Sequence, residues 1–354
     1  MRFDESRRAF IKKSIGLGLG IYGVTHLPYP IIGTAEAKSH ESKVVIARDK
    51  DVIDGNFKVD QDIVRKMLDD AVTKLAGTKS VSAAWKKYFR SDDTVGIKVN
   101  TLSGRWMSSH PELVVAIVDG LRSAGVKEKN IIIWDKDDRE LREAGFSIET
   151  KPSNDARCFG TSPSIGYESD IKTYGSIASR LSRIATFCTA FVNVPVLKHH
   201  TMAGVTLSLK NWFGAINNPN KYHFDTNSER MLAACKYIPD LNSMLFSPSA
   251  LGKRQSLIIC DGIMSQYDMG PGYRPNKTWN YSGLIVSTDP VALDRIGTQI
   301  IEKKRQEVGL RSLSEVGREP EYISVAADRF HRLGTDDPLE IELVSAGGLA
   351  SVGL

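Results

Sequence analysis

The sequence has few cysteines, and none of them are clustered. Cys158, Cys188, Cys235 and Cys260 are scattered, and no C-x-x-C pair occurs. Zinc ribbons and iron–sulfur centres need closely spaced thiolates, so an iron–sulfur cluster is not expected. Spacing alone cannot establish a disulfide such as Cys158 with Cys188, and buried free thiols are the preferred interpretation.

The chain also lacks a large excess of charge and long apolar runs. Its formal net charge is +5, part of which lies in the first 37 residues, and this is too small to indicate nucleic acid as a partner. After residue 38 no apolar run is long enough to span a bilayer. No P-loop, H-E-x-x-H, G-x-S-x-G or kinase motif is present, which removes the enzyme classes that those motifs define.

The first 37 residues have the three-part layout of an export signal. The segment Ser6-Arg7-Arg8-Ala9-Phe10-Ile11-Lys12 is similar to the twin-arginine consensus. A glycine-rich, weakly apolar run follows, and Ala35-Glu36-Ala37 supplies a small-x-small cleavage site. We therefore expect residues 1–37 to be a signal peptide for the twin-arginine translocation machinery. The folded protein would then work in the periplasm or another extracytoplasmic space, with cleavage after Ala37 or retention as an anchor as the two alternatives.

Residues 38–354 are expected to form a single α/β domain, or two closely packed lobes. The clearest unit is a strand over 94–99, a helix capped by Ser109 with Pro111 in its first turn, and a strand over 131–134. Strand, helix and strand at this spacing predict a right-handed parallel crossover. The fold class predicted is α/β, with a mainly parallel sheet, flanking helices and Rossmann-like lobes.

The remaining elements are predicted from periodicity and capping residues. The expected helices cover residues 60–76, 82–89, 203–216 and 289–304. The expected strands cover residues 43–47, 187–196, 256–260, 283–286 and 340–344. Residues 151–185 and 217–250 hold long connections, and long loops in compact domains often carry function or cover a site.

Polar residues follow several of these strands, and ligands of open α/β sheets bind beyond the carboxyl ends of the strands. The candidate binding residues, for a substrate or a cofactor, are Lys98, Asn100, Asp135, Lys198, His199, Lys210, Asn211 and Asp261. The candidate proton-transfer residues are His110 and His200. His223 lies in a loop that is well placed to cover such a site.

Alternatives stay open for several of these residues. Lys198-His199-His200 ends an apolar strand, where it suits an anion site, but it also suits a solvated loop before a helix capped by Thr201. Lys210 has apolar neighbours and would be partly buried, which calls for a partner. His110 suits a helix start with no chemical role equally well, and Asp261 a simple strand-end turn.

Several segments resemble one known family, the domain of unknown function family 362. The matching segments are 95–100, 109–114, 130–135, 193–198, 204–211 and 288–294. The likeness is to the branch with twin-arginine signals. Many relatives carry ferredoxin-type cysteine clusters that this chain lacks, so the resemblance implies no electron-transfer cluster of its own. At the level of the fold alone, the arrangement is similar to nickel-pincer lactate racemase, with His110, Lys198, His200 and Lys210 in comparable places but not matched one to one.

Two functions from different classes are consistent with the sequence. The first is an exported enzyme, isomerase- or racemase-like or an oxidoreductase, that acts on a small anionic substrate in a lysine and histidine pocket. The alternative is a non-catalytic periplasmic protein that binds a metal, a cofactor or a redox partner. The identity of a metal or organic cofactor, the substrate and the oligomeric state are left open.

Overall fold

The computed structural model describes residues 42–223 and 234–347. The export signal predicted over residues 1–37 lies outside the described residues and stays a prediction. Across the described ranges, every helix falls short of the length and apolar character that a membrane crossing needs.

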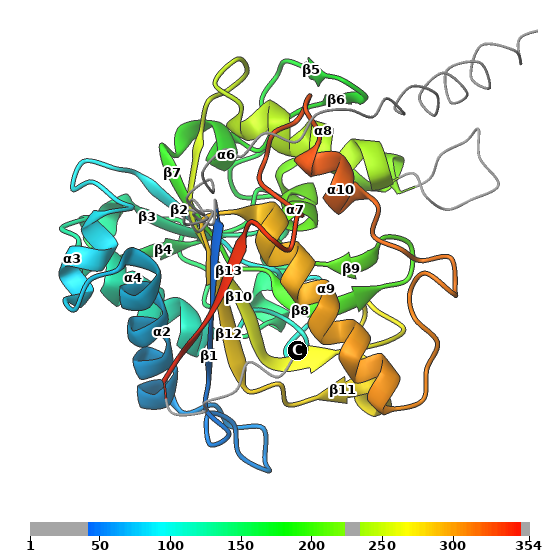
Figure 1. The fold of residues 1–354 in the computed structure, drawn as a ribbon. Coiled ribbons are helices and arrows are strands. Elements are labelled where there is room, and N and C mark those ends of the chain that lie inside the picture. The colour runs from blue at the N-terminus through cyan, green and yellow to red at the C-terminus, as the bar shows by residue number, and fades with distance from the viewer. Residues whose placement is uncertain (1–41, 224–233, 348–354) are drawn as a thin grey trace, which may run out of the picture. The chain divides into compact units, whose positions relative to one another are not determined.

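A large mixed sheet forms the centre of the fold (Figure 1). The strands lie in the order β13 (Ile341–Ala346), β1 (Ser42–Arg48), β12 (Gly283–Ser287), β10 (Arg254–Gln266), β7 (Ala190–Asn193), β2 (Val95–Lys98), β3 (Ile131–Trp134) and β4 (Arg157–Cys158). Neighbours in this order are parallel except at β12, which is antiparallel to both β10 and β1. The predicted α/β class with a mainly parallel sheet is confirmed.

Shorter strands extend this sheet or stand apart from it. The strands β8 (Val196–His200) and β11 (Thr278–Trp279) pair with β10, and β9 (Gly204–Thr206) pairs with β8. A separate two-stranded ribbon consists of β5 (Lys172–Tyr174) and β6 (Ile177–Ser179).

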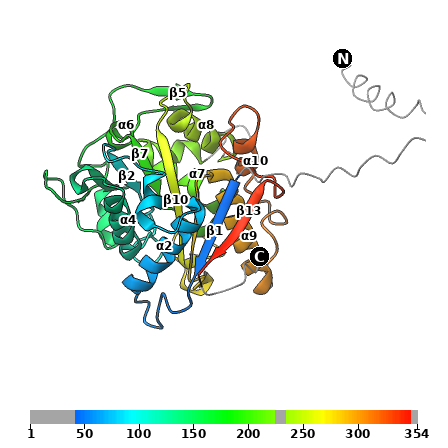
Figure 2. The same ribbon diagram turned by 60° about the vertical axis from the view of Figure 1, so that its left-hand side comes forward.

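Helices cover both faces of the sheet (Figures 1 and 2). One face carries α2 (Gln61–Ala76), α3 (Val81–Lys86) and α4 (Pro111–Ser123). The other carries α7 (Ser208–Asn211), α8 (Ala234–Phe246), α9 (Pro290–Glu307) and α10 (Tyr322–Ala327). The short helix α5 (Asp138–Glu143) follows β3, and the short helix α6 (Arg183–Phe187) precedes β7.

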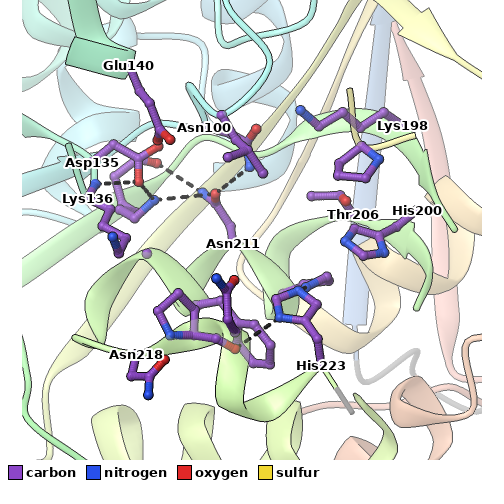
Figure 3. Close-up of a pocket in the computed structure, with 18 of the residues that line it drawn as sticks. Asn100, Asp135, Lys136, Glu140, Lys198, His200, Thr206, Asn211, Asn218 and His223 are labelled. Atoms are coloured by element: carbon purple, nitrogen blue, oxygen red, sulfur yellow. Dashed lines mark hydrogen bonds and ion pairs between the residues drawn. The ribbon is translucent and has the colours of Figure 1, made fainter. Parts of the chain in front are cut away.

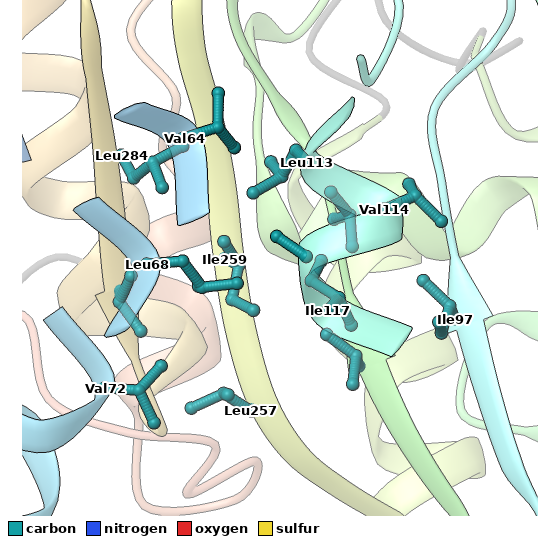
Figure 4. Packing of buried hydrophobic residues seen from close by; sticks show 14 of the residues in the cluster. Val64, Leu68, Val72, Ile97, Leu113, Val114, Ile117, Leu257, Ile259 and Leu284 are labelled. Atoms are coloured by element: carbon teal, nitrogen blue, oxygen red, sulfur yellow. The ribbon is translucent and has the colours of Figure 1, made fainter. Parts of the chain in front are cut away.

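Two hydrophobic cores result, one on each face of the sheet. Successive residues of a strand point to opposite faces, so Leu257 and Ile259 of β10 join the α2 and α4 side while Ile258 and Cys260 join the α9 side. Figure 4 shows the first core, where Leu68 of α2 lies over the sheet. Full burial of such a leucine contributes about 1.5–3 kcal/mol to the stability of the fold. Apolar layers of this kind on both faces stabilise the sheet.

The helix α2 matches the helix predicted over residues 60–76. The carboxylate of Asp60 accepts hydrogen bonds from the backbone N–H groups of Asp62 and Ile63, and Gly77 ends the helix in the left-handed region at φ 64°. An aspartate at this position satisfies amides that have no partner within the helix, and glycine adopts positive φ without steric cost. This helix could therefore be predicted from local sequence.

The predicted crossover from β2 through α4 to β3 is also confirmed. Its predicted cap is wrong, because His110, not Ser109, holds the N-cap position. The Ser109 hydroxyl instead donates to Val194 O at 2.7 Å and accepts from the backbone N–H of Asn100 at 2.9 Å. A tertiary contact thus uses the hydroxyl that local reasoning assigned to the helix, and it ties the ends of β2 and β7 together.

The segment after β7 differs most from the prediction. The expected strand over 187–196 is split, because α6 ends at Phe187 and β7 ends before Pro195. The residues Lys198, His199 and His200 belong to β8, which pairs antiparallel with β9, so no helix begins at Thr201. The expected helix over 203–216 shrinks to α7 and one 3-10 turn.

Asp261 and the cysteines complete the comparison. The strand β10 continues to Gln266, so Asp261 lies within a strand and not at a strand-end turn. Cys158, Cys188 and Cys260 are buried free thiols, so a disulfide between Cys158 and Cys188 is not formed. Burial raises the pKa of the first two thiols to about 12. The side chain of Cys235 lies outside the described residues.

Candidate functional site

A pocket of about 320 Å³ opens where β2 and β3 end, bordered by β8 and α7 (Figure 3). It contains seven of the residues predicted for a site, namely Lys98, Asn100, Asp135, Lys198, His200, Lys210 and Asn211. Figure 3 shows Asp135 and Asn100 toward one side and Lys198, His200 and His223 toward the other. A volume of this size suits a small molecule.

A buried ion pair forms one wall of the pocket. The Lys98 Nζ lies 2.7 Å from Asp135 Oδ1 and donates to Val99 O at 2.7 Å. The other carboxylate oxygen of Asp135 accepts from the backbone N–H and the hydroxyl of Thr101, both at 2.9 Å. A Cβ on Gly214 would stand 2.6 Å from Asp135 Oδ1, so only glycine lets this turn approach the pair so closely. Both charges are therefore compensated within the protein.

Three asparagines connect the strand ends to α7. The Asn211 side chain accepts from Asn100 Nδ2 at 3.0 Å and donates to Asn193 Oδ1 at 2.8 Å. Asn193 lies in a segment that the sequence indicates as a site but is not one of the candidate binding residues, although its place at the end of an apolar strand is a usable signal. Asn100 Oδ1 and Thr206 Oγ1 are buried without a hydrogen-bond partner among the described residues. Unsatisfied buried oxygens beside a pocket are unusual and indicate room for a further donor.

Lys198 is fully buried, and no carboxylate of the described residues pairs with it. Its Nζ donates to Ser103 Oγ at 3.0 Å and to Met107 O at 2.9 Å. Burial lowers the pKa of this lysine to about 7, against the attraction of Asp135. An ammonium has three N–H donors, so one remains for a ligand in the pocket.

Lys210 forms a close pair with His223. The two side-chain nitrogens, Lys210 Nζ and His223 Nε2, lie 2.8 Å apart, and His223 Nδ1 lies 3.0 Å from Pro219 O. Because the carbonyl can only accept, Nδ1 carries the proton and Nε2 accepts from Lys210. Burial lowers the pKa of Lys210 to about 7 and that of His223 to about 4. The ionisable proton of the pair therefore resides on the lysine, which titrates near neutral pH.

His200 has a fixed tautomer. Its Nδ1 accepts from the backbone N–H groups of Met202 at 3.1 Å and Ala203 at 3.2 Å, so the ring proton is on Nε2. Burial, and then the neighbouring Lys210 and His223, hold the pKa of His200 well below its ordinary value. Its ring stacks on that of His223 at 5.6 Å between centroids. This geometry favours a neutral hydrogen-bond donor, because the only basic nitrogen is already occupied.

The structure does not bring His110, His199 and Asp261 into this pocket. Lys198 and His200 share one face of β8, while His199 points to the other face and accepts from the N–H of Gly270 at 3.1 Å. His110 and Asp261 contact each other elsewhere, at a second cavity. Glu140 is a pocket residue that the sequence reasoning missed, and burial raises its pKa.

The pocket is rich in hydrogen-bond donors. Across residues 42–223 and 234–347, no group of three or more histidine, cysteine, aspartate or glutamate side chains could hold a metal ion. Two buried lysines, an imidazole N–H and carboxamide groups instead supply donors around one small space. The fold and the pocket together define an α/β protein with a buried cationic site at the ends of its central strands.

Comparison with known proteins identifies the family. The chain belongs to the family described as Domain of unknown function (DUF362), which matches residues 95–299. All of the residues that line the pocket fall within this range. No curated protein is a significant match.

Among solved structures, the chain is similar to the crystal structure of a protein from Thermotoga maritima. The two share 11% sequence identity with a TM-score of 0.38, over 70% of this chain and 59% of that chain. This chain thus spans less than two thirds of the length of that structure.

Proposed function

We propose that this protein is an exported enzyme that binds a small carboxylate in the pocket and transfers a proton on it, as isomerases and racemases do. The observation that supports this most is the pair of buried lysines, Lys198 and Lys210, which have no carboxylate partner among the described residues and a pKa near 7. Perturbed lysines in a pocket are typical of functional sites, since isolated buried charge is otherwise unfavourable.

Binding would be driven by charge compensation. A carboxylate has two oxygens, each able to accept from Lys198 and from the remaining amide N–H of Asn100. Charge-assisted hydrogen bonds of this kind contribute about 1.5–3 kcal/mol each. Because the anion stabilises the ammonium form of Lys198, which contacts it, binding raises the pKa of Lys198 and takes up a proton near neutral pH. Affinity therefore falls as pH rises above about 7.

The proton step follows from the Lys210 and His223 pair. Neutral Lys210 accepts the proton from the carbon next to the substrate carboxylate, and the electrons of the broken C–H bond remain on the substrate as an enediolate. The N–H of His200 and the ammonium of Lys198 supply donors to the negative oxygens that develop. Lys210, whose N–H is oriented by His223 Nε2 at 2.8 Å, then returns a proton to the carbon.

Deuterium exchange tests this proposal. We expect the wild-type protein in D2O to exchange the proton on the carbon next to the carboxylate of at least one small 2-hydroxy acid, as followed by proton NMR. Lys210→Met should abolish exchange, and Lys198→Met should raise the half-saturating concentration about 10- to 100-fold through loss of a charge-assisted bond. Lys221→Met is the matched control, since Lys221 is exposed and does not line the pocket.

The outcomes separate the two function classes. Carboxylate binding that depends on Lys198 but shows no exchange would replace the enzyme by the non-catalytic binding protein. Exchange that appears only with an added redox cofactor would indicate an oxidoreductase. No binding of any carboxylate by a folded wild-type protein would exclude the small-anion site.

We propose further that residues 1–37 export the folded protein through the twin-arginine translocation machinery to the periplasm or another extracytoplasmic space. The support is the Arg7-Arg8 pair with its glycine-rich apolar run and the Ala35-Glu36-Ala37 site. Changing both arginines to lysine should keep the protein in the cytoplasm, as measured by cell fractionation. Lys13→Gln, which lies outside the consensus segment, is the control, and unchanged export of the double variant would contradict the proposal.

A further inference from the structure

A second cavity of about 590 Å³ lies between residues 53–59, the loop 101–109 and the start of α4. It shares no lining residue with the first pocket. Its apolar lining includes Ile53, Val59 and Met264. The charged side chains around it are of both signs, with Lys58, Arg105 and Arg142 on one hand and Glu112 and Glu143 on the other. Such a balance suits a ligand with little net charge.

A histidine and aspartate pair faces this cavity. The His110 Nδ1 lies 2.8 Å from Asp261 Oδ2, and the same oxygen accepts from the backbone N–H of His110 at 2.8 Å. The second oxygen of Asp261 accepts from the N–H of Ile263 at 3.1 Å, and its side chain is fully buried. Each carboxylate oxygen is therefore held by donors, so the ring proton of His110 sits on Nδ1.

This tautomer leaves a basic nitrogen for a ligand. His110 Nε2 has no hydrogen-bond partner within residues 42–223 and 234–347, and His110 lines the cavity. Burial lowers the pKa of His110, but the Asp261 carboxylate and its hydrogen bond outweigh burial, so the pKa is raised above its ordinary value. An aspartate behind a histidine is the arrangement that strengthens the imidazole as a proton acceptor.

Aromatic rings stand at the same cavity with much of their surface exposed. Phe57 is 48% exposed and Trp106 is 41% exposed. Their ring centroids lie 5.6 Å apart in a T-shaped pair, and Tyr273 stacks on Trp106 at 6.4 Å. The backbone of Phe57 has φ 61°, a left-handed conformation that is rare for a bulky residue. A ligand with a flat apolar ring would cover this surface.

We propose that this cavity binds a planar aromatic ring carrying a hydroxyl group, with the ring against Trp106 and the hydroxyl donating to His110 Nε2. The ring gains the stacking and burial that Trp106 and Phe57 offer. The hydroxyl completes the single free acceptor of the histidine and aspartate pair. A phenolic hydroxyl matches this acceptor better than an aliphatic one, because its pKa of about 10 is closer to that of an imidazole.

The inference does not depend on the carboxylate enzyme proposed above. One loop nevertheless borders both cavities, since Ser103 and Met107 bind the Nζ of Lys198 while Arg105 and Trp106 line the second cavity. Substitution of Lys198 would disturb this loop. The side-chain nitrogen of Lys210 pairs with His223, so Lys210 is the better control residue.

Titration with 4-nitrophenol tests the proposal, because its ionised form absorbs visible light and reports proton transfer directly. The full-length protein near pH 7 should bind the probe saturably through uncharged His110 and increase the nitrophenolate absorbance above that of the free probe. His110→Gln should remove this increase and weaken binding about 3- to 10-fold, the loss expected for one hydrogen bond. Trp106→Ala should weaken binding by a similar factor, and Trp106→Phe should retain most of it.

The controls make the result decisive. Lys210→Met should leave both affinity and absorbance change as in the wild type, whatever becomes of carboxylate turnover. Failure of 4-nitrophenol to bind a folded wild-type protein overturns the proposal. So does binding that is indifferent to both His110→Gln and Trp106→Ala, since the probe then lies elsewhere. Equal or tighter binding of methyl glucoside would show that the ring is a sugar and overturn the aromatic assignment.

Discussion

Asp135→Asn is expected to lower the free energy of unfolding by about 3–5 kcal/mol, because it leaves the buried ammonium of Lys98 without an anion. The pair is held at 2.7 Å, and both residues are almost fully buried. An asparagine side chain has one oxygen in place of two. It would therefore set an amide N–H against one of the groups that now donate to the carboxylate, which include the backbone N–H and hydroxyl of Thr101. Urea unfolding at neutral pH measures the difference.

Asp51→Asn provides the matched control. Its carboxylate pairs with Lys50 at 2.8 Å on the surface, where both side chains are largely exposed. Exposed pairs of this kind contribute about 0–1 kcal/mol, so the control should change stability little. The double change of Lys98→Met with Asp135→Asn should recover part of the loss, because the unpaired charge is gone. A loss below about 1 kcal/mol for Asp135→Asn alone would show that the ion pair is not the anchor of this wall.

The ligand-free protein should become more stable as pH rises above about 7, owing to Lys198 and Lys210. The folded-state pKa of each is about 7, against an ordinary value of 10.5. Between these values the unfolded chain binds protons that the folded chain does not, so stability increases with pH. Each lysine contributes up to about 1.4 kcal/mol per pH unit within that window, and nothing further below or above it.

Lys→Met variants measure this contribution. Lys198→Met and Lys210→Met should each flatten the rise in urea-unfolding stability between about pH 7 and pH 9, and each should stabilise the protein at about pH 6, where the wild type buries a charge. The two effects should not add fully, since the charge of Lys198 contributes to the lowered pKa of Lys210. Lys221→Met should keep the wild-type slope. An unchanged slope in both variants would mean that these lysines are ordinary cations.

The two expectations assign different roles to lysines that look alike in the sequence. Lys98 is neutralised by Asp135, so its substitution should act on stability. Lys198 and Lys210 destabilise the empty pocket, and a carboxylate ligand would reverse that cost at Lys198. Residues that lower the stability of the ligand-free protein but bind its ligand are an expected case of function gained at a cost in stability.

Much of the fold could be predicted from local sequence. The extent of α2, the crossover from β2 to β3 and the start of α9 at Asp289 depend on neighbouring residues, and all three are confirmed. The strand-end rule also placed Lys98, Asn100 and Asp135 together, since parallel strands bring their carboxyl ends to one edge of a sheet.

Other features of the fold could not be predicted from neighbouring residues, because they depend on contacts with residues distant in the sequence. The hairpin of β8 and β9 replaced a predicted helix, since pairing between Lys198 and Thr206 and packing beside β10 outweigh helical periodicity. The Ser109 hydroxyl was taken by Val194, a residue far along the chain. The spacing of residues in the sequence does not indicate such tertiary partners.

The sequence by itself determined the α/β class, the main helices and strands, and the lysine-rich character of the strand ends. Only the tertiary structure decided which side chains share a cavity: Lys198 and His200 enter the pocket while His199 leaves it, and His110 meets Asp261 at another place. It also decided their chemistry. Protonation depends on burial and on contacts such as that of Lys210 with His223, and these exist only once the chain has folded.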